Sequence, residues 1–441
     1  MEQKTPTHNT ERSGAIYDAS TLGRTKFTIL GLQHMFAMFG ATILVPAITG
    51  LSVSATLLFA GIGTLLFHWI TKMNLPAFLG SSFAFIGGYA AVTEVGAGMG
   101  YDQAHALPYA CLGVIFAGLL YFVMALLVKN LGVNRVLRYF PPVVTGPVII
   151  SIGLVLSGSA IQNCMASWPI ALVAIGIIIS CLTWGKKMIA IIPILLGVVG
   201  SYLTAALCGM VDFSSVKAAP WVGIPLEWDN TAISLLSHID WPLAVNAITT
   251  MVPIALATMV EHVGDMCAIS STVGRNYLIE PGLTRTLTGD GVATVVASLF
   301  GAPANTTYGE NTGVLNLTKV FDARVIRLAA VFAILFSFSP KFSALIGAMP
   351  AATIGGVSLV LYGMISSVGV RNLVENKVDM SLSRNVLITA LILVLAIGIK
   401  YGADDAVSFG PITLSGLAIG SIVGIIINAI LPQRKHLGEL E

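Results

Sequence analysis

The sequence predicts an all-α protein that crosses a membrane many times. Of its 441 residues, 56% are hydrophobic and 10% are charged, and the mean hydropathy is +0.87. Because soluble domains carry about 25% charged residues, this composition excludes an ordinary soluble protein. The net charge of +2 is too small to indicate nucleic-acid binding. Residues 1–26 are polar and show no short apolar region with a cleavage site, so we expect no removable signal peptide.

Fourteen apolar runs predict fourteen membrane spans, since about 17–25 residues cross a bilayer as a helix. Their approximate cores are 27–48, 54–71, 76–95, 107–128, 141–158, 167–184, 188–208, 243–266, 286–301, 305–320, 325–346, 351–369, 385–400 and 411–431. The third and the tenth are short and rich in Gly, Ser or Thr. The five cysteines show no Cys-x-x-Cys spacing, so we expect neither a metal site nor a disulfide framework.

The basic residues predict the orientation of these spans. With the N-terminus inside, 20 of the 23 Lys and Arg residues fall on the cytoplasmic side, and Lys217, Lys341 and Lys400 fall outside. This asymmetry follows the positive-inside rule, so we expect both termini in the cytoplasm. The longest outside segment, 209–242, separates seven spans from seven, and we expect Trp228 and Trp241 near the membrane surface.

Seven spans on each side indicate an inverted duplication, as in many secondary transporters. At an offset of 228 residues, Gln33-His34 falls over Glu261-His262, and 80–83 falls over 308–311. The segment 141–147 likewise resembles 350–356. The repeat pairs the two irregular spans, and interrupted spans in corresponding positions indicate a substrate site. The alternative is that their small residues serve only close helix packing.

Three acids lie within or beside these apolar stretches: Glu261, Asp265 and Glu310. An acid at the centre of a membrane helix costs about 2.5–3.5 kcal/mol, so we interpret them as functional. Glu261 and Asp265 are four residues apart on one helix face and would titrate as a coupled pair that handles protons. The alternative makes Asp265 a solvated helix end.

The other polar residues of this region have simpler interpretations. His34 and His262 occupy matching repeat positions, as ligands or relays, or as hydrogen-bonded packing residues. The stretch "EHVGD" lacks the second histidine of a zinc-binding His-Glu-x-x-His helix. We expect Asp290 to be the N-cap of the ninth span.

Two carboxylates and two stretches of exposed backbone suit a planar neutral substrate with N–H and C=O groups. Phe83 and Tyr308 could stack on its faces. Amides, imides and nucleobases fit this description. An anion does not, because no Lys or Arg lies at this depth.

Several longer motifs carry a resemblance to a known family. The stretches "LQHMFAMFGATILVP", "LGSSFAFIGG", "EHVG" and "PANTTYGENTGV" closely resemble the nucleobase–ascorbate transporter family, also called nucleobase–cation symporters, over about residues 25–430. Within this family the sequence is most similar to the bacterial uracil–proton symporters. The resemblance implies a 7+7 inverted repeat in which segments 3 and 10 carry short strands that meet antiparallel.

The resemblance also implies two domains that move against each other. A core domain comprises segments 1–4 and 8–11, and a gate domain comprises segments 5–7 and 12–14. The corresponding ranges are a cytoplasmic tail at 1–26, core halves at 27–129 and 243–346, gate halves at 130–208 and 347–431, an extracellular connection at 209–242, and a cytoplasmic tail at 432–441.

The resemblance also implies roles for individual residues. Substrate binding is expected from Glu261, Glu310, Phe83, Gly309, Tyr308 and Tyr362, with the two acids binding the base and Phe83 and Gly309 offering backbone N–H groups. Proton coupling is expected from Glu261, Asp265 and Glu310, and a supporting polar network from Asn311, Ser82, His34 and His262. Asp265 departs from the histidine common at this position, which puts the proton route in question.

The sequence and the resemblance together predict proton-coupled uracil import across a bacterial inner membrane, with the proton as coupling ion and no other cofactor. The resemblance implies a homodimer through the gate domains. Alternatives are a symporter of xanthine or another purine and, more remotely, an anion exchanger of the same fold. We find no nucleophile–base pair or metal cluster for an enzyme, and a single base site is untypical of a channel.

Overall fold

The computed structural model describes residues 14–133, 135, 141–190, 192–403, 406–409 and 412–431. The predicted C-terminal tail and the first 13 residues lie outside this range. The side chain of Glu310 also lies outside the description, although its backbone lies inside it.

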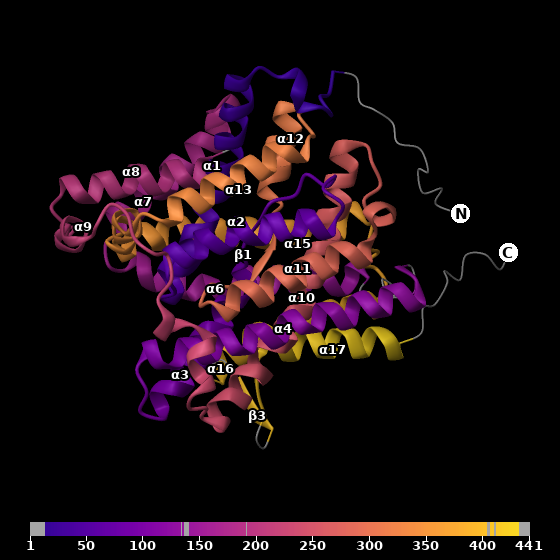
Figure 1. Cartoon of the computed structure of the whole chain (residues 1–441). Coiled ribbons are helices and arrows are strands. Elements are labelled where there is room, and N and C mark those ends of the chain that lie inside the picture. The colour runs from indigo at the N-terminus through magenta and orange to yellow at the C-terminus, as the bar shows by residue number, and fades with distance from the viewer. Residues whose placement is uncertain are drawn as a thin grey trace.

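Long helices make up most of the fold (Figure 1). The helices are α1 (Arg24–Thr49), α2 (Val53–Ile70), α3 (Ile86–Gly98), α4 (Gln103–Leu131), α6 (Pro142–Cys164), α7 (Trp168–Trp184), α8 (Pro193–Leu207), α9 (Ser214–Ala218), α10 (Trp241–Val273), α11 (Leu283–Leu299), α12 (Glu310–Thr318), α13 (Ala323–Ser337), α14 (Pro340–Gly347), α15 (Ala351–Glu375), α16 (Ser383–Gly402) and α17 (Gly416–Ile430). Short turns of helix are η1 (Ala19–Thr21), η2 (Phe83–Phe85), η3 (Lys187–Ala190), η4 (Trp228–Asn230), η5 (Ala232–Leu236) and η6 (Leu278–Gly282).

Seven of the described helices are long and apolar enough to cross a membrane: α1, α2, α4, α6, α10, α15 and α16. The pair α13 and α14, bent by 85°, makes an eighth if it counts as one span. The helices α7, α8 and α17 are apolar but shorter. Together with the composition, these helices make the chain a multi-pass membrane protein. The count of fourteen spans stays a prediction.

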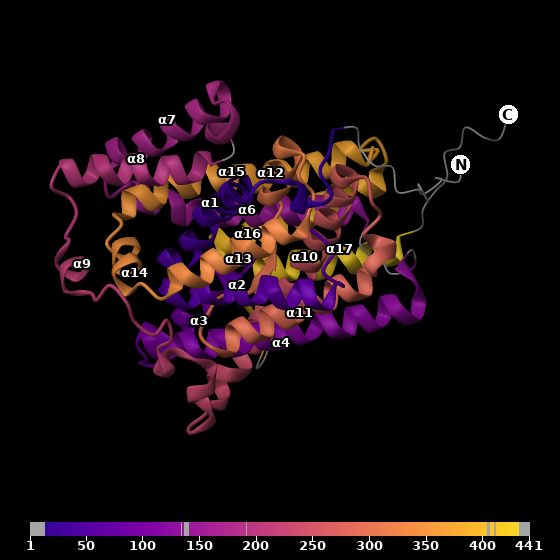
Figure 2. The ribbon, with the colours of Figure 1, turned by 45° about the horizontal axis from the view of Figure 1, so that its top comes forward.

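Helix contacts fall into two sets. The helices α1–α4 pack against α10–α13, and α6–α8 pack against α15–α17. Fewer contacts, such as those of α10 with α6 and α17, join the two sets. Figure 2 shows α7 and α8 along one edge, with α4 and α11 along the opposite one. Whether the sets move as core and gate domains stays a prediction.

Two short strands lie among the helices. β1 (Leu79–Ser81) pairs antiparallel with β2 (Asn305–Thr307), with Gly80 opposite Thr306. The ladder is extended on both sides, because Ser82 N–H donates to Ala304 C=O at 2.9 Å and Tyr308 N–H donates to Phe78 C=O at 2.8 Å. The pair joins segments that are more than 220 residues apart. That these strands interrupt two of fourteen spans stays a prediction.

A second strand pair differs from our expectation. β3 (Ala406–Phe409) pairs antiparallel with β4 (Ile412–Ser415), and α17 begins only at Gly416. We predicted one helical span over 411–431, which is wrong for Ile412–Ser415. Ile412 and Thr413 are β-branched, and β-branched residues favour strands over helices. The hairpin is at the lower edge of Figure 1.

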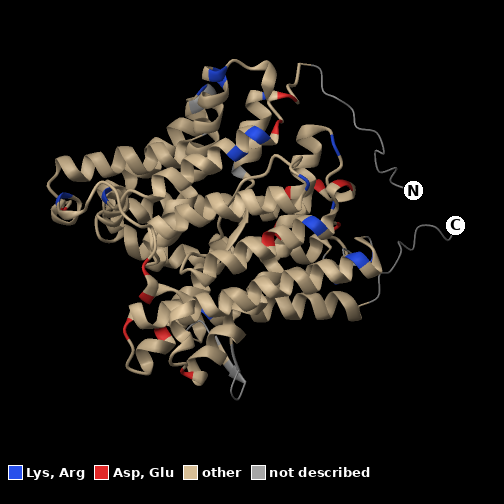
Figure 3. Ribbon diagram, viewed as in Figure 1, with Lys and Arg blue, Asp and Glu red and all other residues tan. Residues whose placement is uncertain are grey.

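Charged residues are scarce along the bundle and gather toward its ends. Figure 3 shows Lys and Arg mainly toward the side where both termini lie. In the segment 209–242, α9, η4 and η5 are short helices, and Trp228 and Trp241 are 60% and 67% exposed. Such exposure leaves both indoles free to contact a membrane surface.

Candidate functional site

The outer edges of β1 and β2 are held by side chains of the surrounding helices. The Leu79 N–H donates to the Thr64 hydroxyl of α2 at 2.9 Å. On β2, the Thr294 hydroxyl of α11 donates to Asn305 C=O at 2.9 Å, and the Asn305 amide donates to Phe59 C=O at 2.7 Å. Backbone groups away from water need such partners, so the helices fix the position of both strands.

A buried acid anchors the end of β2. Asp290 accepts hydrogen bonds from the Thr307 hydroxyl at 2.8 Å and from the Thr307 N–H at 3.3 Å. His262 Nδ1 lies 2.9 Å from the Asp290 carboxylate, and its Nε2 lies 2.9 Å from the Thr286 hydroxyl. Both Asp290 and His262 are buried. His262 therefore ties α10, which carries Glu261, to α11 and β2.

This arrangement corrects our expectation for Asp290. Gly282 precedes α11, and Asp290 lies within the helix with its side chain fully buried. The N-cap assignment is wrong because the helix begins before the apolar run from which we predicted the span. The sequence did contain an indication that Asp290 is buried, because a charged residue within an apolar run is costly. The same argument identified Glu261.

Tyr308 follows β2 and folds back across the strand pair. Its hydroxyl donates to Ser81 C=O at 2.8 Å and lies 3.3 Å from the Ser81 hydroxyl. The Ser81 hydroxyl also donates to Thr42 C=O of α1 at 3.0 Å. The ring therefore bridges β1, β2 and α1.

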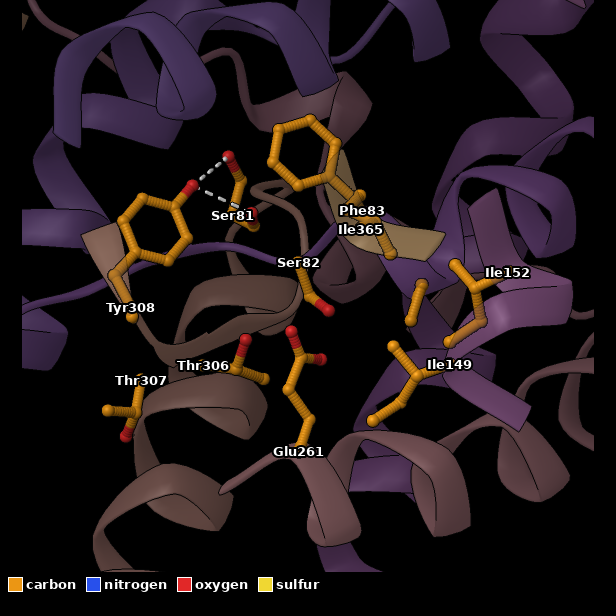
Figure 4. A pocket seen from close by; sticks show the side chains of 12 residues that line it. Ser81, Ser82, Phe83, Ile149, Ile152, Glu261, Thr306, Thr307, Tyr308 and Ile365 are labelled. Carbon is orange, nitrogen blue, oxygen red and sulfur yellow. Dashed lines mark hydrogen bonds between the residues drawn. The ribbon is translucent and has the colours of Figure 1, made fainter. Parts of the chain in front are cut away.

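A pocket opens beside the strand ends (Figure 4). Its lining comprises Ser81, Ser82, Phe83, Ala84, Ile149, Ile152, Glu261, Thr306, Thr307, Tyr308, Gly309 and Ile365. Glu261 reaches in from the middle of α10, and Figure 4 shows its carboxylate pointing toward Ser82 and Thr306. Helices of both contact sets contribute, since α6 and α15 supply the three isoleucines. The arrangement can bind a small molecule between the two sets.

Two helix beginnings lie at this pocket. η2 starts at Phe83 and leads into α3, while α12 starts at Glu310, directly after Gly309. A helix N-terminus exposes backbone N–H groups and carries a partial positive charge. These ends therefore direct backbone N–H groups toward a hydrogen-bond acceptor in the pocket.

Five predicted binding or network residues meet in this one pocket: Glu261, Ser82, Phe83, Tyr308 and Gly309. Tyr362 is buried in α15 and is not among the described lining residues, whereas Ile365, almost one turn further on, is. The side chain of Glu310 lies outside the described residues.

Asp265 lies one turn beyond Glu261 and beside Gly309. A Cβ atom added to Gly309 would come within 3.0 Å of Asp265 Oδ1. Because α10 continues to Val273, Asp265 is not at a helix end, and that alternative does not hold. Its proximity to Gly309 keeps it next to the pocket.

His34 and Asn311 contact each other on the other side of α12. The Asn311 amide lies 3.3 Å from His34 Nδ1 and donates to His34 C=O at 3.2 Å. Both side chains are buried. They join α1 to the first turn of α12, while His262 belongs to the separate contacts with Asp290. Among the described residues, no cluster of three or more His, Cys, Asp or Glu is placed to hold a metal ion.

Known proteins resemble the chain over nearly its whole length. A family model described as "Permease family" matches residues 25–404. The uracil permease of Bacillus subtilis is 43% identical over 418 residues, which cover 92% of each protein. The uracil permease of Bacillus caldolyticus is 42% identical, with 96% of each covered, and that of Escherichia coli K12 is 37% identical, with 90% of this chain and 89% of its own covered.

Solved structures share the fold at low sequence identity. The transmembrane domain of the cyanobacterial bicarbonate transporter BicA gives a TM-score of 0.63 at 15% identity, covering 94% of this chain and 99% of that domain. Murine solute carrier 26 family member A9, an anion transporter in the inward-facing state, gives 0.63 at 10% identity, covering 98% and 73%. These likenesses show the fold alone.

Proposed function

Since the chain belongs to the permease family of nucleobase–cation symporters, we propose that it imports uracil together with a proton. The observation that carries the proposal is the pocket in which the Glu261 carboxylate points at the ends of two strands. The relatives are uracil permeases by name. Uracil offers N–H and C=O groups along one edge, which match carboxylates and backbone amides.

The binding arrangement follows from this pairing of groups. Glu261 accepts a hydrogen bond from a ring N–H, and Glu310 accepts the second. The backbone N–H groups of Phe83 and Gly309 donate to the two carbonyl oxygens. Hydrogen bonds that involve a charged group contribute about 1.5–3 kcal/mol each, so the acids dominate the affinity. Phe83 and Tyr308 supply apolar contact.

Proton coupling arises from the same carboxylates. A carboxylate charge is costly at membrane depth, so binding a proton at Glu261, or sharing one with Asp265 and Glu310, favours the loaded state. Only the fully loaded core domain then moves against the gate domain, which gives alternating access. The contribution of both helix sets to the pocket supports a site that opens to one side at a time.

In the cell, the protein lies in the bacterial cytoplasmic membrane with both termini inside. The one-sided distribution of Lys and Arg supports this orientation. By family resemblance we propose a homodimer formed through the gate domains. The coupling ion is a proton, and no further cofactor takes part.

A purine such as xanthine is the second candidate substrate, because the name of the matching family model refers to xanthine as well as uracil. Anion exchange is a weaker candidate. Two helix beginnings at a pocket suit an anion, but Glu261 would repel it. A panel of bases and anions competing with labelled uracil separates these three functions.

The test uses uptake into proteoliposomes with an imposed pH gradient. The wild-type protein should accumulate labelled uracil when the outside is acidic, and a protonophore should abolish accumulation. Glu261→Gln should lower affinity for uracil about tenfold or more, because it loses a charged acceptor, and should lose its response to the gradient. Glu94→Gln, an exposed acid of α3, is the matched control and should behave as wild type. Unchanged, gradient-driven uptake by Glu261→Gln would refute the coupling mechanism.

A further inference from the structure

The pocket has two chemically unlike halves. The half formed by the strands and α10 offers hydroxyl groups of Ser82 and Thr306 and the carboxylate of Glu261. The opposite half consists of Ile149 and Ile152 of α6 and Ile365 of α15. We call these three residues the isoleucine wall. It presents no hydrogen-bonding side chain to a ligand.

The wall is stiff at the level of its side chains. Isoleucine is branched at Cβ and, within a helix, holds one χ1 rotamer in about 90% of cases. Ile149 and Ile152 are one turn apart and therefore lie on the same face of α6. Both are more than 90% buried, so neighbouring atoms further restrict them.

The backbones of α6 and α15, which carry the isoleucine wall, are packed closely together and cannot move away from the pocket independently. α6 and α15 cross in close contact beside it, since a Cβ atom added to Gly153 would lie 2.2 Å from Tyr362 C=O. The Ser366 hydroxyl donates to Ile150 C=O at 3.0 Å across the same crossing. Gly153 follows Ile152 and Ser366 follows Ile365, so these contacts hold both sides of the wall at a fixed separation.

A rigid apolar wall restricts which edge of a ligand can face it. A ring carbon with hydrogen fits, whereas a ring nitrogen or carbonyl group would lose its water without gaining a partner. When the N–H and C=O groups of a pyrimidinedione face the strands and Glu261, its C5–H and C6–H edge faces the wall. A purine places a second ring with nitrogens in that position, and a 5-substituted pyrimidine places extra bulk there.

We propose that the isoleucine wall determines specificity by admitting pyrimidine bases with an unsubstituted C5–C6 edge and rejecting 5-substituted pyrimidines and purines. This inference rests on the proposed uracil transport. It assigns recognition of the polar edge to the strands and α10, and recognition of the apolar edge to α6 and α15. The two recognitions are separable by substitution.

The test compares bases that compete with labelled uracil for uptake into proteoliposomes. Ile149→Val, Ile152→Val and Ile365→Val each remove one methylene and keep the branch at Cβ, so they preserve the fit to the helix. One methylene in an apolar pocket is worth roughly 10–200-fold in discrimination. We expect at least one of these variants to lower the half-inhibitory concentration of thymine, relative to that of uracil, by about tenfold.

Polarity is tested separately with Ile152→Thr, which has nearly the shape of Ile152→Val but carries a hydroxyl group. We expect xanthine to compete better in the threonine variant than in the valine variant. Equal behaviour of the two would overturn the polar part of the proposal. Ile161→Val, on the exposed face of the same helix, is the matched control and should keep the wild-type ratios.

The outcomes distinguish this proposal from the proposed function. If every valine variant still takes up uracil with the wild-type ratio of thymine to uracil, the isoleucine wall does not set specificity while uracil transport stands. If the wild-type protein takes up no uracil, the proposed function fails first. Protein amount in the liposomes and thermal stability are measured for each variant, and the ratios are compared among the valine variants that fold.

Discussion

At the scale of single residues, close packing around position 80 requires a glycine there. A Cβ atom at this position would lie 2.5 Å from Tyr308 Cε2, 2.6 Å from Cζ and 2.9 Å from Thr42 Oγ1. These distances are far below van der Waals contact, and two of the three atoms belong to a rigid ring. Gly80→Ala should therefore displace Tyr308 from its hydrogen bond with Ser81 C=O and strongly reduce uracil uptake.

Gly87 provides the matched control for this substitution. It lies in α3, a few residues after the same strand, and a Cβ atom added there would meet nothing within 4 Å. Alanine in a helix interior is more favourable than glycine by about 0.5–1 kcal/mol, so Gly87→Ala should keep uptake and slightly raise thermal stability. Equal uptake by both variants would show that the Tyr308 ring can move without loss of function.

Single acids could be found in the sequence, but their partners could not. Glu261 was identified as a pocket residue because a carboxylate within an apolar run is costly. Asp290 meets the same criterion, yet we assigned it to a helix end. Its partners Thr307 and His262 are distant along the chain, and only the folded β2 strand brings them together. A carboxylate in an apolar run indicates function, but the sequence does not distinguish a ligand-binding acid from an anchoring one.

At the scale of elements, the segment from Ala15 to Leu22 is packed against the ends of several helices. Ile16 exchanges hydrogen bonds with Lys319 C=O at 2.9 Å and with Phe321 N–H at 2.8 Å. Ala19 N–H donates to the Asp322 carboxylate at 2.6 Å, and the Tyr17 hydroxyl donates to Val273 C=O at 2.7 Å. This segment thus joins the end of α10 to the connection between α12 and α13.

An ion pair also holds the segment from Ala15 to Leu22 against the helices, and from it we predict how this contact depends on pH. Hydrogen bonds from Ser20, together with the Arg324 guanidinium, lower the pKa of Asp18 from 3.8 to about 2. A lowered carboxylate pKa stabilises the docked segment above pH 3.8, and this contribution is lost as the pH falls toward 2. Hydrogen-exchange protection of the Ile16 and Ala19 amides should therefore be constant between pH 5 and 8.

Asp18→Asn removes the charge at neutral pH and should lower this protection by less than about fivefold, because exposed ion pairs are weak. Asp212→Asn is the control, since Asp212 also has a lowered pKa but lies in the distant segment 209–242. A loss of protection near pH 6 would indicate that another group controls the docking.

Helices and strands could be predicted where a single feature of the sequence, such as a long apolar run, was strong. Long apolar runs predicted the helices α1, α4 and α10 to within several residues at most ends. Short strands were harder to predict: the repeat indicated only two interrupted spans, β1 and β2 were expected from the resemblance alone, and β3 and β4 were missed. A strand of three or four residues carries too little periodicity to be separated from a helix by pattern alone. The 85° bend between α13 and α14 was likewise absent from our single span at 325–346.

At the scale of the whole molecule, the pocket owes its composition to the long-range fold. Its lining combines strands from both halves of the chain with α6, α10 and α15. The sequence could indicate the strand and α10 residues, because an acid and small residues in apolar runs are unusual. It could not indicate the isoleucine wall, since isoleucine is common in membrane helices and only the packing of α6 on α15 places these three side chains at the pocket.

The orientation of the whole molecule is testable with its own cysteines. Cys208 and Cys267 are exposed, whereas Cys111, Cys164 and Cys181 are buried. Cys208 borders the segment 209–242 that we predict to be outside. A membrane-impermeant maleimide should label Cys208 in intact spheroplasts of a Cys267→Ser variant.

A second variant reports the opposite side. Lys377 lies in an exposed turn after α15, and the excess of basic residues there predicts a cytoplasmic position. With both exposed cysteines replaced by serine, Lys377→Cys should react only after the spheroplasts are lysed. Labelling in the reverse order would place both termini outside, and labelling of both in intact spheroplasts would require an even number of spans between them. The positive-inside rule depends on every span in the series. The two positions lie on opposite sides of the seven-plus-seven junction. Their labelling therefore also tests whether the number of spans between them is odd, as predicted.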